Sequence, residues 1–257
     1  MECLRLEHIG QIYHAHNGEE TAIRDVSFTV EKGELLSIVG PSGCGKSTLL
    51  SIVAGLLPPT SGQVFLGGEP LRGYSPRIGY MLQKDNLLEW LTIYQNTLLG
   101  LRIRHTLTSR TRMRAETLLR TYGLWPFRDR FPSQLSGGMR QRAALIRTLA
   151  VSPDVLLLDE AFSALDYQTR LEVTDDVYAI LKQEGVTTLM VTHDIPESIS
   201  MGDRVLILSG RPAVVREILP IVFEGGARTP LFCREHPAFT GYFQHIWKEL
   251  SAHGETG

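Results

Sequence analysis

Gly40-Pro41-Ser42-Gly43-Cys44-Gly45-Lys46-Ser47-Thr48 is the stretch that decides the fold of this chain. It follows the apolar run LLSIV at 35–39, and the run LLSIVA at 49–54 that comes after it is typical of a helix. A buried strand, a glycine-rich turn and a helix N-terminus in this order form the G-x-x-x-x-G-K-[ST] pattern in its required context. We therefore predict an α/β fold with a P-loop whose residues, 40–48, all bind a nucleoside triphosphate.

Each part of this loop has an expected task. Gly40, Gly43 and Gly45 are expected to adopt backbone angles that side chains forbid, so that successive N–H groups turn toward an anion. The positive end of the following helix favours the same anion. Lys46 adds a charge for the β- and γ-phosphates, and the hydroxyl of Ser47 can ligate Mg²⁺. The alternative is a turn that merely joins strand to helix, and the fitting flanks and the further motifs disfavour it.

Composition excludes several classes of protein. The chain has 257 residues, of which 43% are hydrophobic, as expected of an ordinary globular protein. Its net charge of −2 disfavours a freestanding nucleic-acid binder. Neither a membrane span nor a secretory signal is expected, because no apolar run reaches roughly 18 residues and the N-terminus lacks an apolar h-region. The three cysteines are too far apart for a disulfide framework or a metal knuckle, which favours a reducing cytoplasm.

Hydrophobic patterning places the motifs on elements. Residues 1 to about 34 predict short strands with turns at Asn17-Gly18 and Lys32-Gly33. A mainly helical region is expected from about 87 to 150. Further strands are predicted at 63–66, 78–83, 155–160, 187–192 and 205–208, and further helices at 169–184 and 237–250.

Two acids follow the apolar run at 155–158. A buried strand rarely ends in two carboxylates without a cation or hydrogen bonds to offset their desolvation. In P-loop ATPases an acid at such a strand end helps to hold Mg²⁺, which is the expected role of Asp159. The next acid, Glu160, can then act as the general base toward the attacking water. Acids that only cap the next helix are the alternative.

A second helix N-terminus is predicted at Ser136-Gly137-Gly138, within the sequence LSGGMRQR at 135–142. Ser136 could simply be the N-cap of a helix that runs to about Ala150. The functional interpretation is a second phosphate-binding nest, because helix N-termini attract anions. Two such helix ends, about 90 residues apart, need not bind the same nucleotide.

With these motifs in order, the chain resembles the ATP-binding subunits of ABC transporters over residues 4–215. The matching motifs are the P-loop (40–48), the Q-loop residue Gln83, the signature (135–142), Walker B (155–160), the D-loop SALD (163–166) and the switch histidine His193. The resemblance implies a single ABC nucleotide-binding domain over 1–257 with a β-rich N-terminal edge. It implies a core at 1–83 and 153–215, an inserted helical subdomain at about 84–152, and a C-terminal extension at 216–257.

The family's roles transfer to matching positions only as implications of the resemblance. Two copies would sandwich two ATP molecules, so that each P-loop faces the signature of the other copy. Ser136, Gly137 and Gly138 would bind the γ-phosphate held by the partner copy, and Asp166 would cross the dimer interface. His193 would contact the γ-phosphate. Gln83 would sense Mg²⁺ and the attacking water, and link them to the membrane subunit.

The residue that stacks on adenine is assigned on weaker grounds. An aromatic residue ahead of the P-loop usually has this role in the family, and Tyr13 is the candidate here. The alternative is that Tyr13 is an ordinary packing residue.

The segments that follow Gln83 and His193 resemble those of the nitrate, sulfonate, taurine and bicarbonate importer group. This resemblance implies an ATPase on the cytoplasmic face of the membrane that drives a separate permease, with a solute-binding protein, to import a small anionic solute. The permease is expected to dock around 83–90. The alternatives are an exporter ATPase and a non-transport ABC ATPase that acts on the ribosome or in DNA repair. The tail helix is expected to pack on the core.

Overall fold

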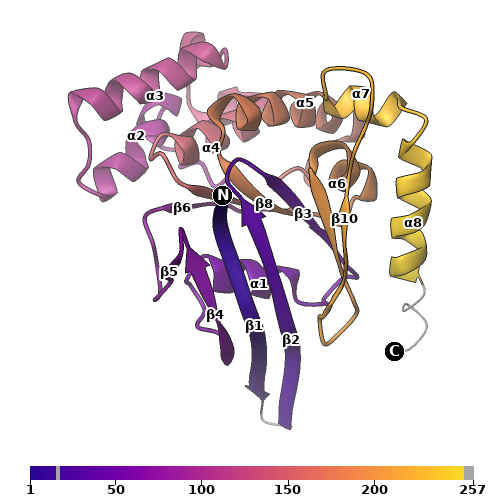
Figure 1. Cartoon of the computed structure of the whole chain (residues 1–257). Helices are drawn as coiled ribbons and strands as arrows, with labels where there is room; N and C mark the ends of the chain where they lie inside the picture. The colour runs from indigo at the N-terminus through magenta and orange to yellow at the C-terminus, as the bar shows by residue number, and fades with distance from the viewer. Residues whose placement is uncertain (16–17, 252–257) are drawn as a thin grey trace.

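The computed structural model describes residues 1–15 and 18–251, which form two β-sheets and the helices around them (Figure 1). The antiparallel sheet has the order β2-β1-β4-β5, with β1 (Glu2–Ala15), β2 (Gly18–Glu31), β4 (Ser61–Leu66) and β5 (Glu69–Pro70). The second sheet has the order β10-β9-β3-β8-β7-β6, with β3 (Leu35–Val39), β6 (Ile78–Met81), β7 (Val155–Asp159), β8 (Thr187–Val191), β9 (Arg204–Leu208) and β10 (Val215–Pro220). All its neighbouring strands are parallel except β9 and β10.

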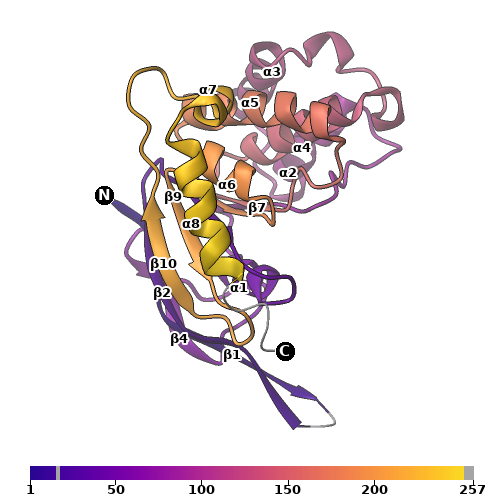
Figure 2. The same ribbon diagram turned by 90° about the vertical axis from the view of Figure 1, so that its right-hand side faces the viewer.

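Helix α1 (Lys46–Val53) lies between the two sheets, and its apolar side chains join β1 and β3 in one hydrophobic cluster. The other helices cover the opposite face and the ends of the central sheet, as the two views show (Figures 1 and 2). These are α2 (Ile93–Ile103), α3 (Ser109–Thr121), α4 (Gly137–Leu149), α5 (Tyr167–Glu184), α6 (Ile195–Met201), α7 (Pro230–Glu235) and α8 (Phe239–Ser251), with short 3-10 turns at Trp125–Phe127 and Pro132–Gln134.

The centre of the six-stranded sheet is buried on both faces. Every residue of β3 and β8 is buried, as are the first four of β7, which explains their nearly continuous apolar sequences. Val191 at the end of β8 pairs with both Ile38 of β3 and Asp159 of β7. The three strands therefore deliver the segments that follow them to one edge of the sheet, where α/β folds bind their ligands.

The N-terminal strands differ from the prediction. The sequence predicts short strands in 1–34, but β1 and β2 each span 14 residues and form one long hairpin. Their register shifts between Leu6 and Ile9, and again on both sides of Gln11. Such bulges interrupt the period-two alternation by which a long strand is recognised. Asn17 of the predicted turn lies outside the described residues.

The helical region contains α2, α3 and α4, whose apolar faces form one cluster with α5 and the central sheet. Side chains of Thr92 and Thr108 close capping boxes that begin α2 and α3. The strand predicted at 78–83 ends at Met81, so Gln83 lies beyond it. The subdomain boundaries at about 84 and 152 stay a prediction.

The C-terminal extension contributes β10, α7 and α8. The helix expected at 237–250 is confirmed as α8, which runs beside α6 and β9 at the edge of the molecule (Figure 2). Ile246 of α8 is fully buried against Val39, Ile199 and Ile207 of the core. Within residues 1–15 and 18–251, no helix has the length and apolar character to cross a membrane.

Candidate active site

The P-loop joins β3 to α1 and is shaped by two of its three glycines. Gly43 has a φ of 71° and Gly45 a φ of 118°, values that favour glycine, as expected. Gly40 differs from the prediction, because its φ lies outside the left-handed region. A Cβ atom there would lie 2.9 Å from Sγ of Cys44 and 3.1 Å from Cβ of Leu208, so Gly40 is required for close packing.

The Cys44 side chain is 1% exposed, and burial raises the pKa of its thiol. Ser42 and Gly43, in contrast, are exposed at the outer part of the loop. The backbone N–H of Cys44 donates to the carbonyl of Pro41 and so tightens the turn. Cys44 therefore offers a ligand only its backbone, as the pattern of a phosphate-binding nest requires.

Lys46, the first residue of α1, is only 7% exposed. Its Nζ donates to the carbonyl oxygens of Gly40, at 2.7 Å, and Pro41, at 2.9 Å. These bonds offset the desolvation of the ammonium group, which would otherwise be costly. The positive charge is thereby held within the loop where phosphates are expected.

Asp159 at the end of β7 faces the start of α1. Oγ of Ser47 donates to Oδ1 of Asp159 at 3.3 Å, and the hydroxyl of Tyr80 donates to Oδ2 at 3.1 Å. Burial is the main cause that raises the pKa of Asp159, and the two hydrogen bonds oppose it. Oxygen ligands of this kind suit a hard cation such as Mg²⁺. Tyr80 was not predicted, although its place on the strand beside β7 could have suggested it.

Among residues 1–15 and 18–251, no group of three or more His, Cys, Asp or Glu side chains could hold a metal ion by itself. Protein-bound Mg²⁺ commonly has only one or two carboxylate ligands and completes its shell with water and substrate phosphates. Ser47 and Asp159 therefore fit an ion that arrives with a nucleotide.

Glu160 and His193 face each other across the ends of β7 and β8. Their Oε2 and Nδ1 atoms are 3.2 Å apart, and both side chains are partly exposed, 27% and 53% respectively. Glu160 has a φ of 48°, in the left-handed region that L-residues other than glycine rarely adopt. Its N–H donates to the carbonyl of Val191 at 2.9 Å, which holds this unusual turn against β8. A carboxylate and an imidazole thus meet beside the P-loop strand.

Gln83 is exposed and reaches the same edge from β6. Its Nε2 donates to Oγ of Ser163 at 3.0 Å, and that hydroxyl donates to the backbone carbonyl of Glu160 at 2.9 Å. The Q-loop residue is therefore connected to the Glu160 turn through the first residue of the D-loop. The resemblance did not assign this role to Ser163.

Tyr13 on β1 lies beside the first turn of α1. Its hydroxyl is 3.2 Å from Oγ1 of Thr48, and the side chain is 37% exposed. An exposed ring next to the P-loop helix is compatible with stacking on a base, and that role stays a prediction.

The signature forms the N-terminus of α4. Oγ of Ser136 accepts the N–H of Met139 at 3.3 Å, so this residue is an N-cap. A Cβ atom on Gly138 would lie 2.7 Å from Cγ2 of Val173 in α5, which explains the need for glycine there. Gly137 is similarly close to Leu165 of the D-loop.

Asp166 caps α5 by accepting the N–H of Thr169 at 3.0 Å, and this bond is the main cause that lowers its pKa. The signature and Asp166 line an open cavity of about 740 Å³, with Gln83 at its border. No hydrogen bond within the described ranges joins Ser136, Gly137 or Gly138 to the P-loop. The structure thus assembles one set of predicted residues around Lys46 and Asp159 and leaves the signature as a separate set.

Comparisons with known proteins bear on the family and the fold of the chain. Residues 23–163 match the family model described as ABC transporter. The chain is 46% identical over 252 residues to the ABC transporter ATP-binding protein YtlC of Bacillus subtilis (strain 168), covering 98% of this chain and 97% of that protein. It is 40% identical to the taurine import ATP-binding protein TauB of Pelagibacter ubique (strain HTCC1062), with 84% and 82% covered. It is 38% identical to the nitrate import ATP-binding protein NrtD of Synechococcus elongatus (strain ATCC 33912 / PCC 7942 / FACHB-805), with 86% and 82% covered.

Solved structures give the same result for the fold. The dimeric structure of MJ0796, a bacterial ABC transporter cassette, matches with a TM-score of 0.72 and 30% identity, covering 86% of this chain and all of that one. A dimeric post-hydrolysis state of the same cassette, bound to ADP and Pi, matches with a TM-score of 0.71 over the same shares.

Proposed function

This chain belongs to the ABC transporter family as an ATP-binding ATPase cassette, and from that premise we propose that it powers a separate membrane permease for import of a small anionic solute. The observation that supports ATP hydrolysis is that two pairs of polar side chains lie at one edge of the central sheet. Ser47 contacts Asp159, and Glu160 contacts His193. This arrangement supports a cation site and a general base that lie side by side.

The proposed chemistry assigns a task to each group. Lys46 and the loop N–H groups bind the phosphates, and Ser47 and Asp159 would hold Mg²⁺, which when bound would supply positive charge against the phosphate oxygens. Glu160 accepts a proton from the attacking water, and His193 contacts the γ-phosphate. Gln83, which is hydrogen-bonded to Ser163, transmits changes at the ATP site to the permease. Positioning and electrostatics lower most of the barrier in phosphoryl transfer.

The second half of each ATP site comes from another copy of this chain. The N-terminus of α4 at Ser136 is an anion-binding helix end that has no hydrogen bond to the P-loop of its own chain within the described residues. The dimeric cassette MJ0796 supports an assembly in which two copies close on ATP. In that assembly Ser136, Gly137, Gly138 and Asp166 act in trans.

Import of an anionic solute is supported by the relatives. Taurine carries a sulfonate group and nitrate is itself an oxyanion, and the import ATP-binding proteins named for them are 40% and 38% identical to this chain. We place the permease contact at residues 83–90, on the cytoplasmic face of the membrane. Trp90 there is 73% exposed, and Leu82, which directly precedes this segment, is 47% exposed. Aromatic side chains such as that of Trp90 are enriched where proteins bind one another.

A pull-down from native membranes tests this proposal. Tagged Glu160→Gln protein, incubated with Mg-ATP in detergent extract, should retain a multi-span permease and a solute-binding protein. A matched variant that also carries Trp90→Asp should lose the permease and still form the dimer. Uptake of labelled taurine and nitrate by vesicles containing the recovered complex then measures solute and direction. Recovery of ribosomes or repair factors without a permease, or outward transport, would overturn the import assignment.

A further inference from the structure

Helix α6 connects the proposed switch histidine to the C-terminal extension. It begins two residues after His193, and the side chain of Asp194 caps it by accepting the N–H of Glu197 at 2.9 Å. One side of α6 packs on β3, the strand that precedes the P-loop, and the other is covered by α7 and α8 (Figures 1 and 2). The extension therefore touches the helix that directly follows His193, although it lies outside the site.

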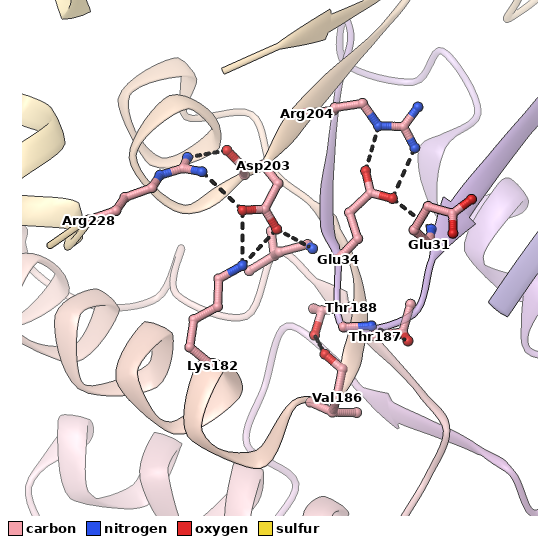
Figure 3. A network of polar contacts seen from close by, with 12 residues as sticks. Glu31, Glu34, Lys182, Val186, Thr187, Thr188, Asp203, Arg204 and Arg228 are labelled. Carbon is pink, nitrogen blue, oxygen red and sulfur yellow. Dashed lines mark hydrogen bonds and ion pairs between the residues drawn. The ribbon is translucent and has the colours of Figure 1, made fainter. Parts of the chain in front are cut away.

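Arg228 of the extension binds the C-terminal end of α6. Its Nη2 donates to the carbonyls of Gly202 and Ile199, and its Nη1 donates to Oδ1 of Asp203 at 3.0 Å. Figure 3 shows Arg228 and Lys182 both directed at Asp203. A cation at a helix C-terminus stabilises the exposed carbonyls and the helix dipole. Arg228 thus fixes the far end of α6 to the extension.

Asp203 also accepts the N–H of Leu35 at 2.8 Å, at the start of β3. The end of α6, the extension and the P-loop strand therefore share one polar network. Because α6 is only seven residues long, a shift at one end moves the other.

Arg234 of α7 provides a second contact of the extension, with helix α5. Its Nη2 donates to Oγ1 of Thr174 in α5 at 3.0 Å. Its Nε and Nη1 are buried, as is Oε1 of Glu197, and none of the three has a hydrogen-bond partner among the described residues. Glu197 is 5% exposed, and burial raises the pKa of its carboxyl, which the charges of Arg170 and Arg234 partly oppose. The hydrogen bond of Arg234 to Thr174 joins α7 to α5, the helix whose Arg170 contacts Asp194 at the N-terminal end of α6.

The N-terminal end of α6 is in turn connected to the D-loop. Arg170 of α5 donates to Oδ2 of Asp194 at 3.2 Å and to the carbonyl of Leu165 at 2.9 Å. A displaced α6 would therefore move His193 relative to Glu160, whose contact with it is 3.2 Å.

We propose that Arg228 and Arg234 of the C-terminal extension are positioning residues for ATP hydrolysis, which act on His193 through α6 and through α5, respectively. This inference rests on the catalytic role proposed above for His193. Neither arginine has a hydrogen bond or ion pair with the P-loop, Asp159 or Glu160 within the described ranges, so their effect is on the rate of hydrolysis and not on ATP affinity.

Steady-state ATPase assays on purified full-length protein test the inference. Arg228→Ala and Arg234→Ala should each lower kcat about tenfold and leave KM for ATP within twofold, because a small misplacement of a catalytic group is costly. The matched control is Lys248→Ala, which removes an exposed cation from α8 and should leave both constants unchanged. Arg228→Lys and Arg234→Lys keep the charge, should recover part of kcat, and serve if an alanine variant does not fold. Unchanged kcat in folded variants would refute the proposal.

A double variant that carries His193→Ala distinguishes an effect on the position of His193 from a general effect on folding stability. If the arginines act through His193, adding Arg228→Ala to His193→Ala should lower kcat no further. Multiplying losses would show that the extension acts elsewhere and would overturn this inference alone. Normal kcat in His193→Ala would instead refute the role assigned to His193, and this inference with it.

Discussion

The P-loop (40–48) and the signature (135–142) both include a helix N-terminus that we expect to bind phosphate, but their surroundings differ. At the P-loop, Lys46 is buried under its own loop, and Asp159, Glu160 and His193 all have partners. At the signature, Ser136 caps α4 beside an open cavity, and within the described residues its side chain hydrogen-bonds only to the backbone N–H of Met139. In the proposed mechanism the first group acts within one chain, whereas the second binds the nucleotide of another copy. We infer that one chain holds all of the proposed catalytic groups (the chemistry set: Lys46, Asp159, Glu160 and His193) but only part of the groups that bind each ATP.

The largest effect should come from the chemistry set. Glu160→Gln keeps shape and hydrogen bonding but removes the base, so kcat should fall roughly 1,000-fold, within the usual range for proton-transfer catalysis. ATP affinity, measured by calorimetry, should change less than twofold. Glu69→Gln, at an exposed position of β5, is the matched control. A parallel loss of affinity would show that Glu160 contributes to binding, and would weaken the contrast between the P-loop and the signature.

Mixing two defective copies tests whether the P-loop and the signature act in trans. Lys46→Ala and Ser136→Arg should each lower ATPase activity about 100-fold, because each removes phosphate stabilisation from every site. A mixed dimer has one intact site, formed by Lys46 of one copy and Ser136 of the other. An equimolar mixture should therefore be much more active than either variant alone. A mixture as inactive as its components would place both motifs on one nucleotide of one chain.

Glu197 of α6 extends the comparison to a buried ionisable residue near the chemistry set. Burial raises its pKa to about 7, above the usual carboxyl value, so the folded state binds a proton more strongly than the unfolded state. The free energy of unfolding should thus fall as pH rises from about 5 to 7, and this loss is complete above pH 7. Glu197→Gln should reduce the difference in unfolding free energy between pH 5 and pH 8 by on the order of 2 kcal/mol. Thermal unfolding at both pH values measures it, and an unchanged difference would assign the pH dependence to other groups.

The smallest effect is expected at Tyr13. Tyr13→Ala should weaken ATP binding about fivefold, or about 1 kcal/mol, the contribution of one aromatic stack. Tyr13→Phe keeps the ring and should bind like the unaltered chain, with calorimetric titration as the measurement. Equal losses in both variants would assign the effect to the hydroxyl contact with Thr48, and no loss in either would leave Tyr13 as a packing residue.

Much of the chemistry set could be predicted because local sequence determines it. The order of strand, glycine turn and lysine places the P-loop, and a buried strand that ends in two acids places Asp159 and Glu160. Parallel pairing then brings strand ends together without further information, as Val191 illustrates by pairing with both Ile38 and Asp159. The resemblance supplied the roles of His193 and Gln83 but not their contacts.

What could not be predicted depends on tertiary context. Bulges around Gln11 concealed the length of the N-terminal hairpin. Gly40 is required by the nearby Cys44 and Leu208 side chains, and nothing in the local pattern distinguishes this from a need for positive φ. The partners of Arg228 and Arg234 are separated from them in sequence by up to 60 residues, so their contacts with α6 and α5 follow only from the folded chain.

The left-handed turn at Glu160 has a consequence for how this protein can evolve. A non-glycine residue with a φ of 48° lowers folding stability by roughly 1–2 kcal/mol, and glycine would relieve that strain. Selection for heat resistance alone should therefore enrich glycine or asparagine at position 160, and such proteins should lose ATPase activity. Selection for ATPase turnover keeps the glutamate. The residue that favours activity at position 160 is therefore not the residue that favours thermal stability.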